Sequence, residues 1–269
     1  MQGVSNVKAY SAFDRLAAAA LPALAADLPS RTTAPPYVPP APVFTWTGFY
    51  IGLNVGYNWG NNDLTLYSNP LYAGYFPTGI NTDSDGFTGG IQAGYNWQIN
   101  QFVLGVEGDW VWLDSGKTGS ATVAYPSGYP GAGIGGASVT STGKIGADWL
   151  ATLRGRIGYA IDRWMIYGTG GLAWGNVNSS SSLSASYVNT TGIATVDLWQ
   201  GKNDDTRFGW TLGAGVEYAI TNNITTKLEY LYYDLGSKNY VVAGGTLPAS
   251  AARAKMDGNI VRAGLNYKF

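Results

Sequence analysis

The sequence predicts an all-β fold: an eight-stranded antiparallel up-and-down transmembrane β-barrel, with short turns on one side of the membrane and long loops on the other. Three observations lead to this prediction. Eight segments alternate between apolar and small or polar residues, their connections alternate between short and long, and aromatic residues gather at the segment ends. Successive side chains of a strand point to opposite faces, so each segment has one apolar face. Eight such segments in a row are typical of a transmembrane barrel.

The clearest alternation is in residues 47–59. The odd positions hold Thr, Phe, Ile, Leu, Val, Tyr and Trp, whereas the even positions hold Gly, Tyr, Gly, Asn, Gly and Asn. Glycine and asparagine cannot fill a hydrophobic core, so the apolar face must contact another apolar medium, and lipid is the simplest one. A tilted strand crosses the hydrocarbon layer in about 9–11 residues. Because lipid does not tolerate an open sheet edge, this strand implies a closed barrel.

Seven further segments repeat the alternation, and their connections differ in length. Tight polar turns are expected at Ile99-Asn100, Ile161-Asp162 and Thr221-Asn223. Outer-membrane barrels have short periplasmic turns and longer extracellular loops, so the four long connections are expected to be extracellular loops. The other strands are expected at 86–97, 101–112, 148–160, 163–175, 206–219, 223–234 and 259–269, and the loops, rich in Gly, Ser, Asn and Asp, at 60–85, 113–147, 176–205 and 235–258.

Aromatic residues lie at the strand ends, where a soluble core would not need them. Amphipathic rings favour both bilayer interfaces, so two belts are expected. The periplasmic belt comprises Phe49, Trp97, Phe102, Tyr159, Trp164, Tyr218, Tyr267 and Phe269, and the outer belt comprises Trp59, Phe87, Trp110, Trp112, Trp149, Trp174, Phe208 and Tyr232.

The composition narrows the class of protein. Charged residues are 12% of the 269, against roughly 25% in an average soluble domain. No apolar run reaches the roughly 18 residues of a transmembrane helix. The formal net charge of −1 argues against nucleic-acid binding. The chain has no cysteine and no histidine, which excludes disulfides, histidine-dependent triads and the usual zinc sites.

Three regions are expected along the chain. Residues 1–25 are expected to be a signal peptide, because a short apolar stretch ends at Ala23-Leu24-Ala25, an A-x-A cleavage site. Residues 26–45 contain two Pro-Pro pairs and are expected to form an extended periplasmic linker. Residues 46–269 are expected to form the barrel. With the linker in the periplasm the first strand runs outward, which places the short turns on the periplasmic side.

The face opposite the apolar residues carries charges of both signs. A charge inside a narrow barrel must be paired, so these residues are expected to form ion pairs that occupy the lumen. Glu217 and Lys227 flank a short turn and are expected to lie side by side. The expected lumen cluster comprises Glu107, Asp109, Arg154, Arg156, Arg207, Glu217, Lys227, Glu229 and Arg262.

Three stretches carry a family resemblance. They are FTWTGFYIG at 44–52, KLEYLYYDLG at 227–236 and the closing VRAGLNYKF at 261–269. Together with the strand pattern they resemble the small porin-like outer-membrane immunogenic proteins of alphaproteobacteria. The resemblance implies an eight-stranded outer-membrane barrel with exposed antigenic loops, an envelope-integrity role and no catalytic residues.

The last strand also carries an expected targeting feature. Leu265, Tyr267 and Phe269 share one face and resemble the terminal signature by which outer-membrane barrels are handed to their insertion machinery. The expected partners are therefore that machinery together with outer-membrane lipids and lipopolysaccharide, and no nucleic acid. The oligomeric state is left open.

Several functions are compatible with this pattern. A structural envelope protein and surface antigen with a plugged lumen is favoured, and a small-solute or ion porin is the alternative. An enzyme is not expected, and a soluble lipocalin-type barrel would need the apolar face inside. No cofactor is expected. The remaining hypothesis is a haem-binding surface protein, with candidate ligands Met165, Met256, Tyr67, Tyr72, Tyr75, Tyr125 and Tyr129.

Overall fold

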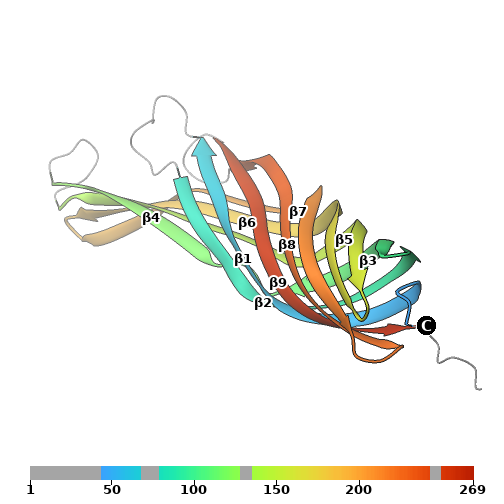
Figure 1. Ribbon diagram of the computed structural model, residues 1–269. Helices are drawn as coiled ribbons and strands as arrows, with labels where there is room; N and C mark the ends of the chain where they lie inside the picture. The colour runs from blue at the N-terminus through green and yellow to red at the C-terminus, as the bar shows by residue number, and fades with distance from the viewer. Residues whose placement is uncertain (1–43, 68–78, 128–134, 243–249) are drawn as a thin grey trace, which may run out of the picture. The chain divides into compact units, whose positions relative to one another are not determined.

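The computed structural model describes residues 44–67, 79–127, 135–242 and 250–269, so the expected signal peptide and almost all of the linker lie outside the described residues. No helix in this part of the chain is long and apolar enough to cross a membrane. The strands in these residues are β1 (Gly48–Tyr67), β2 (Gly79–Ile99), β3 (Phe102–Leu113), β4 (Thr118–Tyr125), β5 (Ala137–Ile161), β6 (Trp164–Asn189), β7 (Gly192–Ala219), β8 (Ile224–Val242) and β9 (Ser250–Lys268) (Figure 1).

Eight of these strands close into a ring, as predicted. The sheet order is β3-β2-β1-β9-β8-β7-β6-β5-β4, and an additional pairing of β3 with β5 closes the barrel. β4 continues the line of β3 along the same edge of β5. The turns after β2 and β5 contain Asn100 and Asp162 at φ 54° and 50°. Asn and Asp are the non-glycine residues that adopt this left-handed conformation most readily, which explains their place in the turns.

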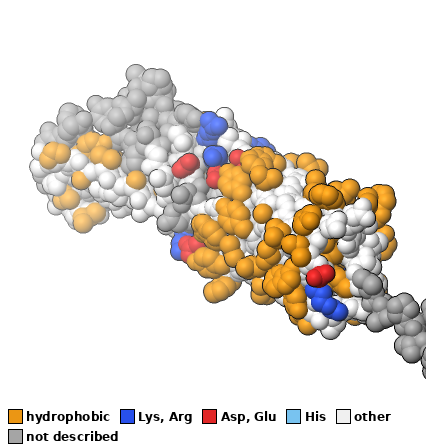
Figure 2. Space-filling view, viewed as in Figure 1, with side chains coloured by type: hydrophobic (Ala, Val, Ile, Leu, Met, Phe, Trp, Pro, Cys, Tyr) orange, Lys and Arg blue, Asp and Glu red, His pale blue; other side chains and the backbone are white. Residues whose placement is uncertain are grey.

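The apolar faces of the strands form a belt on the outside of the barrel. Leu53 is 65% exposed and Phe87 78% exposed, and the predicted aromatics are exposed or half-exposed on this outer surface. Figure 2 shows hydrophobic side chains gathered over one part of the barrel, with acidic and basic groups at the edges of that part. Exposed apolar area of this extent needs an apolar environment, so the belt marks where lipid surrounds the barrel.

The segments expected as extracellular loops are largely β-strand. β6 and β7 run far beyond the belt, and only Thr190 and Thr191 separate them, so residues 176–205 form a hairpin and not a loop. The segment 113–147 similarly holds β4 and the first part of β5. Small polar residues indicate loops by composition, but here continuous cross-strand pairing overrides that preference.

Beyond the belt the ring divides into two four-stranded sheets. Pairing of β2 with β3 ends at Thr88 and Leu113, and pairing of β7 with β8 ends at Trp210 and Asp234. Past these points the described strands pair as β2-β1-β9-β8 and as β4-β5-β6-β7 (Figure 1). We call this part of the molecule the extension.

The extension has a polarity opposite to that of the belt region. On β6, odd positions face inward throughout, but the outward positions change from apolar Trp174 to polar Ser180, and the inward ones from Thr169 to Leu183. On β5, an irregularity between Ala147 and Leu150 adjusts the phase. A hydrophobic core lies between the two sheets of the extension and continues into the upper lumen; it includes Leu64, Ile80, Val139, Ile145, Val177, Leu183, Trp199, Ala252 and Met256.

Candidate functional site: the lumen of the barrel

Four carboxylates and four cations meet in the middle of the lumen. Each occupies an inward position of its strand, and none is more than 7% exposed. Eight of the nine predicted residues are therefore brought together. They are Glu107 and Asp109 on β3, Arg154 and Arg156 on β5, Glu217 on β7, Lys227 and Glu229 on β8, and Arg262 on β9.

Glu107 is the centre of the cluster. Its carboxylate accepts hydrogen bonds from Arg154 at 2.5 Å and from the Lys227 ammonium at 2.8 Å. The Tyr50 hydroxyl donates a third bond of 2.7 Å. Arg154 lies directly opposite Glu107 in the sheet register, whereas Lys227 reaches it across the lumen. The contacts of Glu107 thus join opposite walls of the barrel.

Arg154 and Arg262 link the remaining carboxylates of the central group. Arg154 donates to Asp109 at 2.8 Å and to Glu229 at 3.1 Å. Arg262 donates to the same two residues, at 2.7 Å to Glu229 and 3.1 Å to Asp109. Each arginine therefore bridges two carboxylates from different strands, and the planar guanidinium suits this forked contact.

Glu217 and Lys227 lie opposite each other as predicted, but they do not form an ion pair with each other. The two residues lie opposite each other in the pairing of β7 with β8. However, Lys227 binds Glu107, and the Glu217 carboxylate instead accepts from Arg156 at 2.7 Å, Asn266 at 2.9 Å and Thr225 at 2.5 Å. A lysine side chain is long enough to reach across a narrow lumen, and three arginines, Arg154, Arg156 and Arg262, also lie within 4 Å of the Glu107 carboxylate.

Arg207 does not belong to the cluster, which corrects the prediction. It faces inward, but it lies ten positions before Glu217, about 33 Å along an extended strand. There one guanidinium nitrogen donates to the Ala254 carbonyl at 2.9 Å, beside the core of the extension. Alternation predicts whether a side chain faces inward or outward, but not where it lies along the barrel axis. The position of Arg207 along that axis depends on how far β7 extends.

Two inward tyrosines complete the cluster and were not predicted as part of it. The Tyr167 hydroxyl donates to Glu229 at 3.0 Å, and its ring lies 3.9 Å from the Arg156 guanidinium. A Cβ on the neighbouring Gly215 would lie 2.6 Å from that hydroxyl, so glycine makes room for the ring. Tyr50 is held in the same way beside Gly94. The available signal was a large aromatic residue on an otherwise small or polar face.

The end of the lumen beside the short turns is filled by the residues before β1, and we call this group of side chains the plug. Trp46 is 1% exposed and packs with Val103, Ala160, Met165 and Ala219. Its backbone NH donates to the Gln98 side chain at 2.7 Å, and the Lys268 ammonium lies 4.7 Å from the Phe44 ring. Phe44, expected in the linker, thus packs against the barrel. Sequence reasoning assigned this stretch no role in the lumen.

The predicted C-terminal residues stand on the lipid-facing surface. Leu265, Tyr267 and Phe269 are all exposed, and the rings of Tyr267 and Phe269 are 5.2 Å apart in an edge arrangement. The Phe269 NH donates to the Phe49 carbonyl at 2.9 Å, so the last residue joins the end of the chain to β1.

The candidate haem ligands are scattered. Tyr72, Tyr75 and Tyr129 lie outside the described residues. Tyr67 and Tyr125 lie on β1 and β4. Met165 and Met256 are both fully buried, Met165 in the plug around Trp46 and Met256 in the core of the extension.

A closed ring of eight antiparallel strands, an apolar outer belt and a charged interior define an integral outer-membrane β-barrel protein. Residues 16–269 match the family described as the outer membrane protein beta-barrel domain, and the chain belongs to that family. The resemblance to alphaproteobacterial outer-membrane immunogenic proteins is confirmed by the relatives that follow, and the protein is located in the outer membrane of a Gram-negative bacterium.

Two relatives cover most of the chain. The 31 kDa outer-membrane immunogenic protein of Brucella melitensis is 40% identical over 254 residues, 92% of this chain and 93% of the relative. The 22 kDa outer membrane protein of Rhizobium leguminosarum bv. viciae is 33% identical over 233 residues, 86% of this chain and 82% of the relative. Among solved structures, the outer membrane protein OprG from Pseudomonas aeruginosa is 12% identical with a TM-score of 0.43, covering 83% of this chain and 96% of that one.

Proposed function

We propose that this protein is a structural, surface-exposed barrel of the outer membrane whose lumen is closed to solutes, with no enzymatic activity. The observation that carries the proposal is the cluster of four carboxylates and four cations, which hydrogen bond from wall to wall across the barrel. The positive and negative charges are equal in number, so neither a cation nor an anion is attracted into the cluster.

The strand number and two further layers of side chains support a closed lumen. Eight strands enclose a space that side chains fill, whereas open aqueous channels have about sixteen strands or more. Between the cluster and the short turns lies the plug around Trp46, and on the other side of the cluster lies the hydrophobic core that continues into the extension. A solute would have to pass an apolar layer, a paired charged layer and a second apolar layer.

The extension supports a role at the cell surface. Its outer face is polar, and the short turns at Asn100 and Asp162 lie at the opposite end of the barrel. If those turns are periplasmic, the extension stands outside the cell, where antibodies reach it. The relatives named as immunogenic outer-membrane proteins agree with a surface-antigen role. The belt would contact outer-membrane lipids and the lipid part of lipopolysaccharide.

A narrow pore is the second candidate, and one observation favours it. Along the inner wall of β1 and β2, Asn58, Asn62, Ser84 and Thr88 are buried with side-chain atoms that have no hydrogen-bond partner. Buried polar atoms are usually satisfied, and bound water is the ordinary partner. A hydrated wall of this kind is a route along which water or small ions could pass.

Single-channel recording in planar bilayers separates the two candidates. The unmodified protein is expected to show no steady conductance, and the double variant Arg154→Ala, Arg156→Ala is expected to show ion leakage, because it removes two of the cations that hold the cluster together. Lys255→Ala is the matched control, since Lys255 forms an exposed ion pair with Asp257 in the extension. A steady, large conductance of the unmodified protein that the double substitution leaves unchanged would favour the pore.

The C-terminal residues are proposed as the insertion signal for the barrel-insertion machinery. Phe269→Ala tests the side chain alone, because the backbone bond from residue 269 to Phe49 is kept. The variant is expected to accumulate in the periplasm and to reach the outer membrane at a lower level. Outer-membrane abundance equal to that of the unmodified protein would contradict this role.

A further inference from the structure

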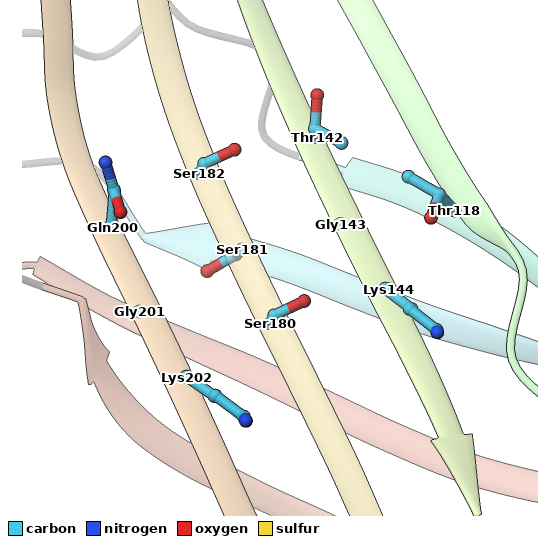
Figure 3. Close-up of a pocket in the computed structure, with 10 residues that line it drawn as sticks. All are labelled: Thr118, Thr142, Gly143, Lys144, Ser180, Ser181, Ser182, Gln200, Gly201 and Lys202. Atoms are coloured by element: carbon cyan, nitrogen blue, oxygen red, sulfur yellow. The ribbon is translucent and has the colours of Figure 1, made fainter.

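A polar hollow lies on the outer face of the extension. Its volume is about 390 Å³, and it spans four neighbouring strands, β4 to β7 (Figure 3). Outward-facing side chains supply most of the wall, namely Thr118, Thr142, Lys144, Ser180, Ser182, Gln200 and Lys202, and no aromatic residue contributes.

The sheet register arranges these side chains in two rows. Ser180 on β6 lies directly between Lys144 on β5 and Lys202 on β7. The next row has Ser182 between Thr142 and Gln200. Because neighbouring strands are about 4.8 Å apart, the two lysine backbones are about 10 Å apart, with a hydroxyl group midway. Figure 3 shows both lysine side chains leaving their strands in the same direction.

The hollow is open to water and distant from the lipid belt. Lys144 and Lys202 are exposed, whereas the intervening Ser181 points inward, where it accepts a hydrogen bond of 3.4 Å from Tyr240. Ser180 is six residues beyond Trp174 of the outer aromatic belt, about 20 Å along the strand. A ligand in this hollow would therefore approach from the aqueous side.

Lys144 and Lys202 differ in their ion pairing from three other lysines of the extension. Lys117 pairs with Asp85, Lys238 with Asp205 and Lys255 with Asp257. Within the described residues, neither Lys144 nor Lys202 forms an ion pair, although Asp204 lies on the same face one row nearer the membrane. The hollow thus brings together two positive charges that form no ion pair within the described residues, on a chain whose net charge is −1.

We propose that this hollow binds an anionic saccharide, that is, a sugar bearing phosphate or carboxylate groups. The two ammonium groups would contact the anionic groups, and charge-assisted hydrogen bonds of this kind are the stronger ones. The four hydroxyl side chains and the Gln200 amide supply both donors and acceptors for sugar hydroxyls. This function goes beyond a structural role in the envelope. The saccharide is either part of an outer-leaflet glycolipid or a soluble polymer outside the cell.

Calorimetric titration of the refolded protein in neutral detergent tests the proposal. Inositol hexakisphosphate serves as the anionic probe and myo-inositol as the uncharged one. The double variant Lys144→Gln, Lys202→Gln is expected to bind inositol hexakisphosphate at least tenfold more weakly than the unmodified protein. The matched control is Lys238→Gln, Lys255→Gln, which removes the same charge elsewhere in the extension and is expected to keep the affinity within about twofold. The exposed positions leave folding intact, which circular dichroism checks.

Two results would overturn the proposal: equal affinity of the Lys144, Lys202 variant and the unmodified protein, or an equal loss in the control variant, which would indicate general charge attraction only. The source of the saccharide is resolved in a second series. Binding of purified lipopolysaccharide but not of its dephosphorylated form assigns the site to the outer leaflet, whereas binding of soluble polygalacturonate alone assigns it to a soluble polymer. Binding of neither contradicts the proposal.

Discussion

The belt region and the extension are built from the same strands but have opposite polarity. Within the belt, β6 presents Leu172 outward and Thr169 inward; further along, it presents Ser180 outward and Leu183 inward. The solvent explains the difference: the belt is surrounded by lipid, so its polar side chains turn inward and must pair with one another, while the extension is surrounded by water and can build an ordinary hydrophobic core. On β6, the point at which the polarity reverses marks the edge of the lipid belt.

Removing a charge from the lumen is the largest single disturbance expected. Arg262→Ala leaves Glu229 and Asp109 without one of their cations in a buried site. Breaking a buried ion pair in this way costs about 3–5 kcal/mol. The free energy of unfolding of the refolded protein in urea measures the loss. A change no larger than that of an exposed pair, as in Lys255→Ala at about 0–1 kcal/mol, would show that the lumen is hydrated.

A comparable loss of unfolding free energy is expected from a substitution in the core of the extension, for a different reason. Leu183 is fully buried between the two sheets. Leu183→Ala removes buried methyl groups and leaves a cavity, at a cost of about 2–5 kcal/mol. Denaturant unfolding followed by tryptophan fluorescence, to which Trp199 in the same core contributes, is the measurement. Ser182→Ala is the control at a half-buried outward position, and an equal effect of the two substitutions would contradict the assignment of inside and outside.

The cost in stability of an arginine on the outer face should show whether that position is surrounded by lipid or by water. Leu53 and Asp63 face outward on the same strand, one in the belt and one in the extension. Leu53→Arg is expected to cost about 2–4 kcal/mol, because the charge enters the hydrocarbon layer. Asp63→Arg is expected to change stability by less than about 0.5 kcal/mol. Equal unfolding free energies for the two variants, reconstituted in lipid, would remove the evidence for the belt.

The smallest expected effect concerns the surface of the extension. A hydrogen bond from Lys238 holds the pKa of Asp205 below its ordinary value of 3.8. A lowered folded-state pKa gives a stabilising contribution that is complete above the unfolded pKa and is lost as the pH falls through the folded one. NMR titration of Asp205 is expected to show its pKa rising toward the ordinary value in Lys238→Ala. An unchanged pKa would show that the pair does not form in solution.

The belt region could be predicted from sequence much more completely than the extension. Alternation identified every strand that crosses the lipid and the inward direction of all nine charges, because large apolar residues make the period of two unmistakable. In the extension many of the outward residues are Ser, Thr and Asn, which indicate loops by composition, so the paired strands were missed. Arg207 was misplaced for the same reason, since its height depends on the length of β7. The place of Trp46 in the lumen was not predicted, because a single aromatic residue before a strand is not part of any alternating pattern.

Labelling of single cysteines on β6 tests the central claim most directly. The natural chain has no cysteine, so Thr169→Cys, Leu172→Cys and Ser180→Cys each report one environment: the lumen, the lipid and the water around the extension. In intact cells, a membrane-impermeant maleimide is expected to label only Ser180→Cys. Labelling at position 169 would show an open lumen, and labelling at 172 would place water where lipid is expected. Absence of labelling at 180 would contradict an extension exposed at the cell surface.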